Sequence, residues 1–339
     1  LAVKTDGTLW AWGRNYYGQL GDGTAANKNT PTQMGTDTDW ASVAAGSVHA
    51  IAVKTDGTLW AWGSNSSGQL GDGTNVNKNT QAQIGTDTDW DYIAAGGSYT
   101  LALKSDGTLW TWGGNSSGQL GDGTTTNKNT PTQMGTDTDW ASVAAGNAHT
   151  IAVKTDGTLW IWGSNSSGQL GDGTTTNKNT PTQMGTDTDW ATAAAGSNHT
   201  IALKTDGTIW AWGGNVYGQL GDGTNVDKNT PTQIGTDTDW DYIAAGSSHT
   251  LAVKTDGTQW AWGRNQTRQL GDGTRVDKNT PTQIGTDTDW AIVAAGSTHT
   301  VGVKAVGTLW AWGWNPYGQL GDGTNITKYT PTQIGTDTD

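Results

Sequence analysis

The sequence predicts an all-β fold, a seven-bladed β-propeller of four-stranded antiparallel blades with about 50 residues per repeat. The segment LAVKTDGTLWAWG, or a close variant, begins at residues 1, 51, 101, 151, 201, 251 and 301 without an insertion or deletion. Apolar and polar residues alternate within each copy, and no helical periodicity is present. Short strands that recur at a fixed period are typical of one sheet per blade. The alternative, a solenoid, would need polar caps that neither end supplies.

The repeats indicate one propeller domain, residues 1–339. Its copies are 1–50, 51–100, 101–150, 151–200, 201–250, 251–300 and 301–339. The third and fourth copies differ at only nine positions, so we infer recent amplification or consensus design. Seven copies of 50 would need 350 residues, 11 more than 339, and the last copy stops at the first Asp of the segment DWASVAAGSVHA. We therefore expect the first blade to lack its inner strand.

Each copy contains the pattern of a β-hairpin. Residues 49–55 alternate apolar and polar side chains, Asp56-Gly57 interrupts them, and residues 58–62 resume the alternation. Asp-Gly is a strong two-residue hairpin signal, because both residues tolerate a positive φ. The sequence therefore predicts two central strands joined by a tight turn.

Two further strands complete the expected blade. We expect one at residues 41–45, ended by Gly46, and a weaker one near residues 32–34. Pro31 at the start of the weaker strand suits the edge of a sheet, because proline cannot donate a hydrogen bond to a neighbouring strand.

Tryptophan must supply much of the core, because the chain has 21 Trp and no Phe. Trp60 and Trp62 are two residues apart on a predicted strand, so both rings leave the same face of the sheet. Burying each ring would contribute at most roughly 4–6 kcal/mol. We expect the pair to pack against the neighbouring blade, with Trp40 on the first strand also in the core.

Composition excludes several classes of protein. The 18 basic and 31 acidic residues, all of the latter Asp, give a net charge of −13, which repels phosphate and argues against a nucleic-acid partner. The absence of Cys excludes disulfides, thiolate catalysis, zinc–thiolate sites and iron–sulfur clusters. No apolar stretch approaches the ~18 residues of a membrane span, and no signal peptide is evident. The location stays open between secreted, cell-surface and cytoplasmic.

Repeated polar residues favour structural roles. A histidine, or Tyr99 in one copy, recurs in successive copies, and a bond that fixes a turn is needed in every blade whereas a catalytic group is not. The segments Thr36–Asp39 and Gly71–Thr74 favour Asx-turns, with weak cation binding as the alternative. The chain has no Glu for an EF-hand loop, no dinucleotide fingerprint and no Walker loop. We expect no catalytic residue, no cofactor and no metal.

Four motifs carry a resemblance to a known family. They are Gly46-x-x-His49, Asp56-Gly57, Trp60-Ala61-Trp62-Gly63-x-Asn65 and Gly68-Gln69-Leu70-Gly71. Their spacing resembles the repeat of the regulator of chromosome condensation family, with near-identical repeats as in bacterial members, over the whole chain. The resemblance implies a seven-bladed propeller. It implies no single function, because the family includes a small-GTPase exchange factor, a plant UV-B photoreceptor and protein inhibitors of β-lactamase.

Two of these functions depend on residues or segments that this chain does not contain. The photoreceptor's tryptophans stand between the Gly and the His of the motif, where this chain has pairs such as Ser47-Val48 and no Trp. The exchange factor uses blade-specific residues and an inserted wedge, whereas these copies contain no insertion. A member that binds a protein needs only varied residues on one rim.

The variable positions differ in character around the expected ring. In three consecutive copies these positions hold only Ser or Gly, as in Ser64, Ser66 and Ser67. The other four copies carry residue types that are enriched at binding hot spots. We identify as candidate partner-binding residues Arg14, Tyr16, Tyr17, Tyr217, Arg264, Arg268, Trp314 and Tyr317. A closed ring would place them on one arc, and drift after duplication is the alternative explanation.

These observations favour a non-enzymatic propeller that serves as a protein-interaction or structural module. The expected partner is another protein on one rim, with neither nucleic acid nor membrane involved. The alternative is a multivalent, lectin-like carbohydrate-binding propeller, which would use aromatic side chains exposed in every blade. We expect a monomer whose open edge strand in the first blade offers a site for association.

Overall fold

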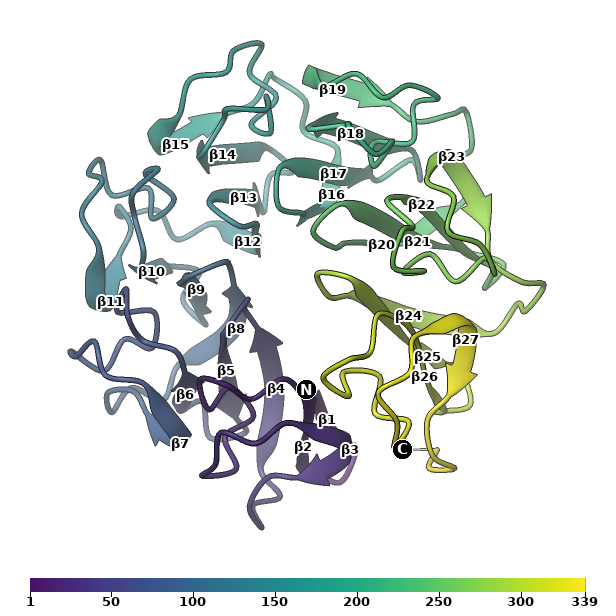
Figure 1. Cartoon of the computed structure of the whole chain (residues 1–339). Helices are drawn as coiled ribbons and strands as arrows, with labels where there is room; N and C mark the ends of the chain where they lie inside the picture. The colour runs from purple at the N-terminus through teal and green to yellow at the C-terminus, as the bar shows by residue number, and fades with distance from the viewer. Residues whose placement is uncertain (339) are drawn as a thin grey trace. The chain divides into compact units, whose positions relative to one another are not determined.

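A computed structural model describes residues 1–338, which form 27 β-strands in seven antiparallel sheets (Figure 1). The first sheet has three strands and the other six have four, which makes them the blades of a seven-bladed β-propeller. The predicted fold class is thus confirmed, including the first blade without an inner strand. None of these residues forms a helix able to cross a membrane.

The chain divides into two compact units. Unit 1 comprises Leu1–Asp156, Trp160–Ser164 and Asn177–Gln183, and unit 2 comprises Gly157–Leu159, Asn165–Thr176 and Met184–Asp339. Apart from Leu159, the strands of the first four blades belong to unit 1, and those of the last three blades belong to unit 2.

The strands of the first four blades follow one another in sequence order within each sheet. They are β1 (Ala2–Val3), β2 (Leu9–Gly13), β3 (Lys28–Gln33), β4 (Trp40–Ala45), β5 (His49–Lys54), β6 (Leu59–Gly63), β7 (Lys78–Gln83), β8 (Trp90–Ala95), β9 (Tyr99–Lys104), β10 (Leu109–Gly113), β11 (Lys128–Gln133), β12 (Trp140–Ala145), β13 (His149–Lys154), β14 (Leu159–Gly163) and β15 (Lys178–Gln183).

The last three blades repeat the order of a complete blade. They are built from β16 (Trp190–Ala195), β17 (His199–Lys204), β18 (Ile209–Gly213), β19 (Lys228–Gln233), β20 (Trp240–Ala245), β21 (His249–Lys254), β22 (Gln259–Gly263), β23 (Lys278–Gln283), β24 (Trp290–Ala295), β25 (His299–Lys304), β26 (Leu309–Gly313) and β27 (Lys328–Gln333).

The predicted hairpin joins β5 and β6. Gly57 adopts a φ of 77°, in the region that favours glycine, and its N–H donates to the Lys54 carbonyl at 2.9 Å. Val53 then pairs with Leu59 and His49 with Gly63. Lys54 N–H donates to the Thr58 carbonyl at 3.0 Å, so the turn consists of the three residues Thr55, Asp56 and Gly57. The predicted hairpin is confirmed, but its turn is one residue longer than the two-residue Asp-Gly turn that the sequence predicted, and only Gly57 has a positive φ.

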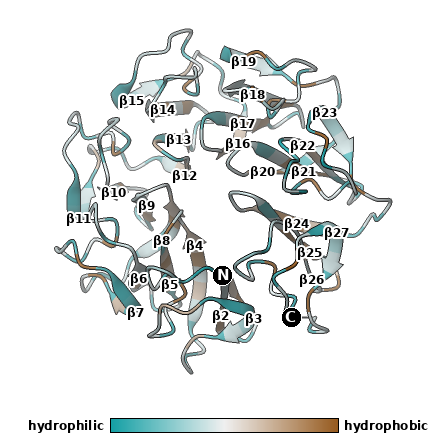
Figure 2. Ribbon diagram, viewed as in Figure 1, coloured by the Kyte–Doolittle hydropathy of each residue, from teal (hydrophilic) through white to brown (hydrophobic). Residues whose placement is uncertain are grey.

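The outer strand is longer than the sequence predicted. We expected it near residues 32–34, and β3 instead begins at Lys28 and runs through Pro31. The pairing with β2 shifts register between Ala11 and Gly13, and β3 is the last strand of its sheet. An edge position beside an irregular pairing accommodates a residue without an N–H. The outer strands β7, β11 and β15 are correspondingly hydrophilic (Figure 2).

The tryptophans form the contact between consecutive blades of unit 1. Trp40 packs edge-on against Trp60 and Trp62, with ring centroids 5.8 and 6.2 Å apart, and this group covers the aliphatic side chains of Leu9 and Ala11 in the preceding blade. Trp62 is fully buried, whereas Trp60 is half-buried. Trp60 and Trp62 thus lie on the same face of the sheet, as predicted, but only the ring of Trp62 is completely enclosed.

A lysine covers the half-buried ring of this group. The Lys54 ammonium lies 4.8 Å from the ring centroids of both Trp40 and Trp60, and it binds the carboxylates of Asp37 and Asp39 at 2.6 and 3.0 Å. Burial would lower the pKa of Lys54, but the two carboxylates outweigh it and raise the pKa. The Thr36–Asp39 segment therefore binds a lysine of its own chain.

Candidate interaction surface

The variable positions lie on the loop that follows the third strand of each complete blade, and an asparagine holds that loop. In the second blade the buried Asn65 accepts a hydrogen bond from Leu70 N through Oδ1 and donates through Nδ2 to Asp72 Oδ1, each at 2.9 Å. Nδ2 also donates to the Thr74 carbonyl at 3.0 Å. Because these contacts fix the loop, exposed Ser66 and half-buried Ser67 can vary without loss of the scaffold.

The Gly71–Thr74 segment contains the predicted Asx-turn. The Asp72 carboxylate accepts hydrogen bonds from the Thr74 backbone N–H at 3.0 Å and from its hydroxyl at 2.8 Å. Burial alone would raise the pKa of Asp72, but the bonds from Thr74, Asn65 and Lys78 outweigh it, and the pKa lies below its usual value. The carboxylate is therefore a structural acceptor within its own loop.

In unit 2 two candidate residues from consecutive blades stack on each other. Tyr217 follows β18 and Arg264 follows β22, and the guanidinium carbon lies 5.0 Å from the centroid of the tyrosine ring. Arg264 donates through Nη2 to Gln266 Oε1 at 3.4 Å, while its Nε is buried and has no hydrogen-bond partner within residues 1–338. The pair thus combines an aromatic ring with a guanidinium whose Nε is closed to a partner and whose terminal nitrogens make one hydrogen bond.

The next blade of unit 2 supplies a second aromatic pair. Trp314 and Tyr317 follow β26 and contact each other edge-to-face, with centroids 5.4 Å apart and planes at 88°. Both side chains are half-buried, so the packing holds them in place while part of each ring faces solvent. We call Tyr217, Arg264, Trp314 and Tyr317 the aromatic–arginine surface.

Arg268, on the same loop as Arg264, is enclosed by a neighbouring side chain. Its side chain is buried, and its guanidinium carbon lies 3.6 Å from the ring centroid of Tyr329, to whose hydroxyl it also donates a hydrogen bond. Its φ of 68° makes it the one non-glycine residue with a positive φ in the described chain. The structure thus places this candidate residue beneath the exposed ring of Tyr329, which belongs to the next blade.

The remaining candidate residues belong to unit 1. Arg14 and Tyr16 are exposed and Tyr17 is half-buried, and the two tyrosine rings contact each other edge-to-face at 4.9 Å. The Tyr17 N–H donates to Gln19 Oε1 at 2.8 Å, the bond that Ser67 makes in the next blade. The same scaffold therefore presents tyrosine in one blade and serine in another.

The repeated histidines belong to the scaffold. Nε2 of the buried His49 lies 3.0 Å from the Thr100 hydroxyl, which donates to the Gln69 carbonyl at 2.8 Å. Because that hydroxyl has one hydrogen, we assign the proton of His49 to Nε2. Burial lowers the pKa of His49 to about 4, so the ring is neutral at pH 7. Tyr99 replaces a histidine by donating from its hydroxyl to the His149 carbonyl.

The described part of the chain holds no group of three or more His, Cys, Asp or Glu side chains that could bind a metal ion. Sequence reasoning missed two features, one of them at a candidate residue. Tyr329, the partner of Arg268, stands where the other six copies have Asn, and this single departure was the available signal. The position of Lys54 between two indole rings was not predictable from a local pattern, because its carboxylate partners lie 15 and 17 residues earlier in the sequence.

Comparison with protein families gives matches over most of the chain. The RCC1-like domain matches residues 43–338, and the Regulator of chromosome condensation (RCC1) repeat matches residues 6–53. No curated protein matches the sequence significantly.

Several solved structures are similar to the chain. Prp20p from Saccharomyces cerevisiae, described with its binding to Gsp1p and histones, is 24% identical with a TM-score of 0.88, over 98% of this chain and 87% of that one. Human WBSCR16 is 21% identical with a TM-score of 0.87, over 97% and 94%. Yeast RCC1 (Prp20) bound to Kap60 is 23% identical with a TM-score of 0.86, over 96% and 83%. At these identities the likeness shows a shared fold.

Proposed function

The chain belongs to the RCC1-like domain family, and from this premise we propose that it is a non-enzymatic protein-interaction module whose partner docks on the aromatic–arginine surface of unit 2. The observation that carries the proposal is the stacked pair of Arg264 and Tyr217 beside a blade that presents Trp314 and Tyr317. Aromatic residues and arginine dominate the binding energy of protein interfaces. The yeast relative Prp20 is described with protein partners in two of the similar structures, which supports the same class of function.

The chemistry of the surface indicates what a partner must offer. Rings that are already packed lose little conformational freedom on binding, so they suit a flat apolar side chain. Of the five N–H donors of Arg264, one is used on Gln266 and that of Nε is buried, which leaves three on the terminal nitrogens for a carboxylate. In a chain with net charge −13 and only four arginines, this local positive charge would orient an acidic partner segment.

Arg14, Tyr16 and Tyr17 of unit 1 form a second exposed group that we propose as an additional contact. Arg268 has another role in the proposal. Because it is buried against Tyr329, it would shape the loop that carries Arg264 rather than touch the partner.

The carbohydrate-binding alternative has no such support. A lectin with equivalent sites would need a repeated aromatic ring open to solvent. In residues 1–338 none of the tryptophans is an exposed side chain, and the half-buried ring of each complete blade lies under a lysine, as Trp60 does under Lys54. Titration with a panel of sugars checks this directly: several equivalent weak sites would favour the lectin.

The proposal is tested by comparing three proteins as bait for crosslinked partners from the source cells. The parent is compared with a variant in which Tyr217, Arg264, Trp314 and Tyr317 are replaced by Ser, the residue that stands at these positions in the second and fourth copies. A control variant carries Ser66→Ala, Ser67→Ala, Ser116→Ala and Ser117→Ala in unit 1. We expect parent and control to recover the same partner and the surface variant to lose it. Recovery by all three would refute the assigned surface.

A further inference from the structure

Two kinds of variable position meet within each blade of unit 2. One is the residue that follows the third strand, such as Arg264 or Trp314, and the other is the residue before the histidine in the turn between the first two strands, such as Ser248 or Thr298. The Arg264 N–H donates to the Ser248 carbonyl at 2.8 Å, and the Trp314 N–H donates to the Thr298 carbonyl at 3.0 Å. The loop and the turn are thus joined directly at positions where both vary.

The preceding blade brings a third variable residue to the same place. Arg264 stacks on Tyr217 of that blade, with its guanidinium carbon 5.0 Å from the ring centroid. At the previous junction a Cβ built on Gly214 would lie 3.4 Å from the Cβ of Asn198 and 3.6 Å from that of Ser167. The backbone therefore brings three variable positions together at each junction, and we call them a junction triplet.

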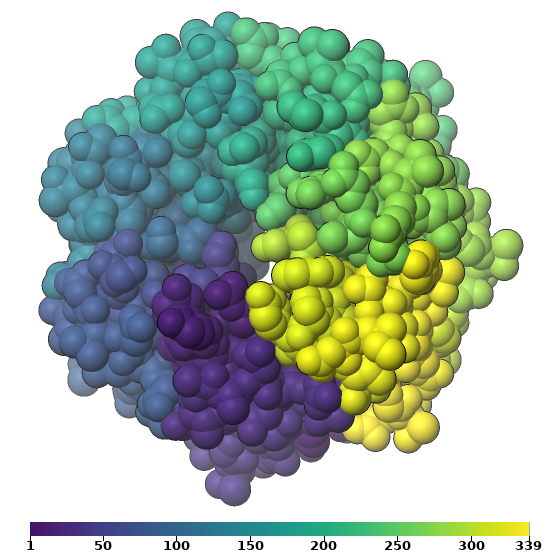
Figure 3. Space-filling model, viewed as in Figure 1, coloured from purple at the N-terminus to yellow at the C-terminus, as the bar shows by residue number. Residues whose placement is uncertain are grey.

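Two neighbouring junction triplets of unit 2 carry large side chains. The sixth and seventh blades lie side by side, joined by the hydrogen bond from Gly273 N–H to the Tyr329 carbonyl at 3.0 Å (Figure 3). All six side chains of their triplets are half-buried. By the repeat, the two triplets are Arg264, Ser248 and Tyr217, and Trp314, Thr298 and Thr267.

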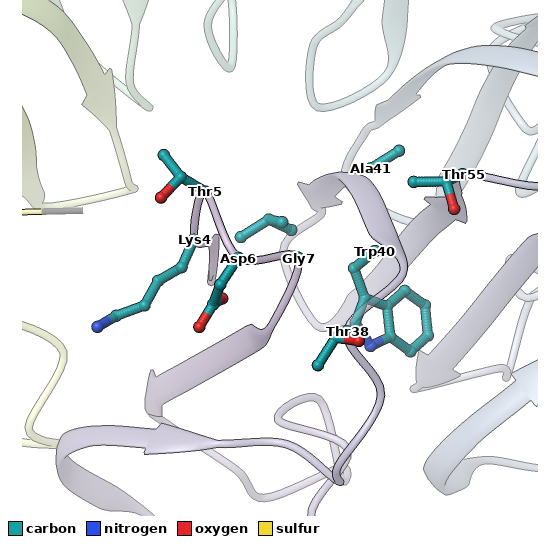
Figure 4. A pocket seen from close by; sticks show the side chains of 9 residues that line it. Lys4, Thr5, Asp6, Gly7, Thr38, Trp40, Ala41 and Thr55 are labelled. Atoms are coloured by element: carbon teal, nitrogen blue, oxygen red, sulfur yellow. The ribbon is translucent and has the colours of Figure 1, made fainter.

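The triplets lie at one end of the blades, away from the two remaining connections. Because neighbouring strands are antiparallel, the connections after the first and third strands share one end, and those after the second and fourth strands share the other. Figure 4 shows this second end in the first blade, where the turn at Gly7 lies beside Trp40. The two ends can therefore differ in charge.

Most of the negative charge lies at the end opposite the triplets. There, in the sixth blade, the carboxylates of Asp237 and Asp239 share the single ammonium of Lys254 at 2.6 and 3.0 Å. At the end with the triplets, Asp272 is matched by Lys278 at 3.3 Å, and the guanidinium of the triplet adds a positive charge. An acidic segment therefore meets less repulsion at this end than the net charge of −13 implies.

We propose that the triplet of Arg264 is an anion subsite for a carboxylate side chain of an extended, acidic protein segment, and that the triplet of Trp314 takes an adjoining apolar side chain. The inference rests on the function proposed above and adds Ser248, Thr267 and Thr298 to the partner-binding residues. Three N–H donors on the terminal nitrogens of Arg264 match the two oxygens of a carboxylate, and Ser248 adds a hydroxyl donor. One guanidinium suits a single negative charge, whereas phosphate groups are bound by arginine clusters.

The test uses random peptides displayed on phage and selected on the immobilised chain. Selected peptides should share an Asp or Glu close to an aromatic or aliphatic residue. For a synthetic selected peptide, Arg264→Gln should weaken binding about tenfold and Ser248→Ala about threefold in fluorescence anisotropy. Ser98→Ala, at the same turn position in unit 1, should leave binding unchanged. Replacing the acid of the peptide by its amide should weaken binding to the parent but not weaken it further in Arg264→Gln.

Transfer of the two triplets to unit 1 tests whether they are sufficient. Ser98 already stands there in the place of Ser248. The substitutions that complete both triplets are Ser67→Tyr, Gly114→Arg, Ser117→Thr, Ala148→Thr and Ser164→Trp. Made in the variant with Ser at residues 217, 264, 314 and 317, they should restore binding of the selected peptide.

The outcomes separate this inference from the function on which it rests. Selected peptides without an acidic residue, undiminished binding to Arg264→Gln, or failure to select any peptide overturns the anion subsite, while the comparison of crosslinked partners still judges the protein-interaction function. A transfer that restores no binding in a protein with the Tm of the parent also overturns the inference. Selected peptides that bind the variant with Ser at the four surface positions as tightly as the parent count against both.

Discussion

The guanidinium of Arg268 stacks on the ring of Tyr329, with its central carbon 3.6 Å from the ring centroid, and both residues depart from the other six copies. The other copies have Gly and Asn at these positions. In the neighbouring pair, Gly218 has a φ of 76°, and a Cβ built on it would lie 2.5 Å from the Cα of Asn279. Because the clash is with a backbone atom, the Cβ of Arg268 requires a local shift whichever residue stands opposite, and what Tyr329 adds is a ring that stacks on the guanidinium.

A double-mutant cycle should detect this coupling. Tyr329→Asn alone leaves the buried charge of Arg268 without its aromatic partner, so we expect a loss of stability. Arg268→Gly together with Tyr329→Asn restores the pair of the other copies and relieves the left-handed backbone of Arg268, so the double variant should be at least as stable as the parent. We expect a coupling energy of about 1–3 kcal/mol by urea denaturation. Additive effects of the two substitutions would contradict the paired interpretation.

The two tryptophans of one strand should differ in their contribution to stability. Trp162 is fully buried, and its Nε1 donates to the Gln119 carbonyl at 2.9 Å, whereas Trp160 is half-buried. Trp162→Ala should lower the free energy of unfolding by about 3–5 kcal/mol, since it leaves a cavity and removes one of the two hydrogen bonds to the Gln119 carbonyl. Trp160→Ala should cost clearly less, and Trp314→Ala less again. Equal losses at residues 160 and 162 in chemical denaturation would show that the burial difference has no energetic consequence.

The buried histidines should make the protein sensitive to mild acid. Burial lowers the pKa of His49 from 6.5 to about 4, and burial together with the charges of His199 and His299 lowers that of His249 to about 3. The folded state therefore binds these protons less tightly than the unfolded state. The stability is fully present above pH 6.5 and is lost as the pH falls toward the folded pKa. For His49 alone the loss at pH 5 should be about 2 kcal/mol.

Tyr99 provides a matched control for this pH dependence. His49→Tyr and His249→Tyr copy a replacement that the chain already contains, in which the tyrosine hydroxyl donates to a backbone carbonyl. Unfolding curves between pH 5 and pH 7 should flatten in these variants, because a titrating ring has been removed. An unchanged slope in the double variant would assign the acid sensitivity to other groups.

The sequence predicted the blades because each signal was local and was repeated seven times. Asp56-Gly57 marks a turn that closes within a few residues, and the spacing of Trp60 and Trp62 fixes the face of one strand. The extent of β3 was less predictable, because the bulge at Gly13 that accommodates Pro31 depends on pairing with another strand. Local patterns therefore predicted the existence of the strands better than their first and last residues.

The candidate surface was predictable in composition but not in geometry. Departures from the repeat singled out Arg264 and Arg268 together, although one stacks on Tyr217 at the loop and the other is buried under Tyr329. Which of two arginines is buried depends on contacts between residues 47 and 61 positions apart, and no short-range pattern records these contacts. Differences among the copies identified the candidate positions, and burial then distinguished Arg264, a candidate contact, from Arg268, whose side chain is enclosed.

The central claim is that the aromatic–arginine surface binds a protein partner, and the ratio of affinities for a purified partner tests it most directly. The partner recovered by the parent would be titrated against the parent, against the variant with Ser at residues 217, 264, 314 and 317, and against the control with Ala at residues 66, 67, 116 and 117. We expect an affinity loss of at least 30-fold, or about 2 kcal/mol, for the surface variant and less than threefold for the control. Equal affinities of all three proteins would contradict it.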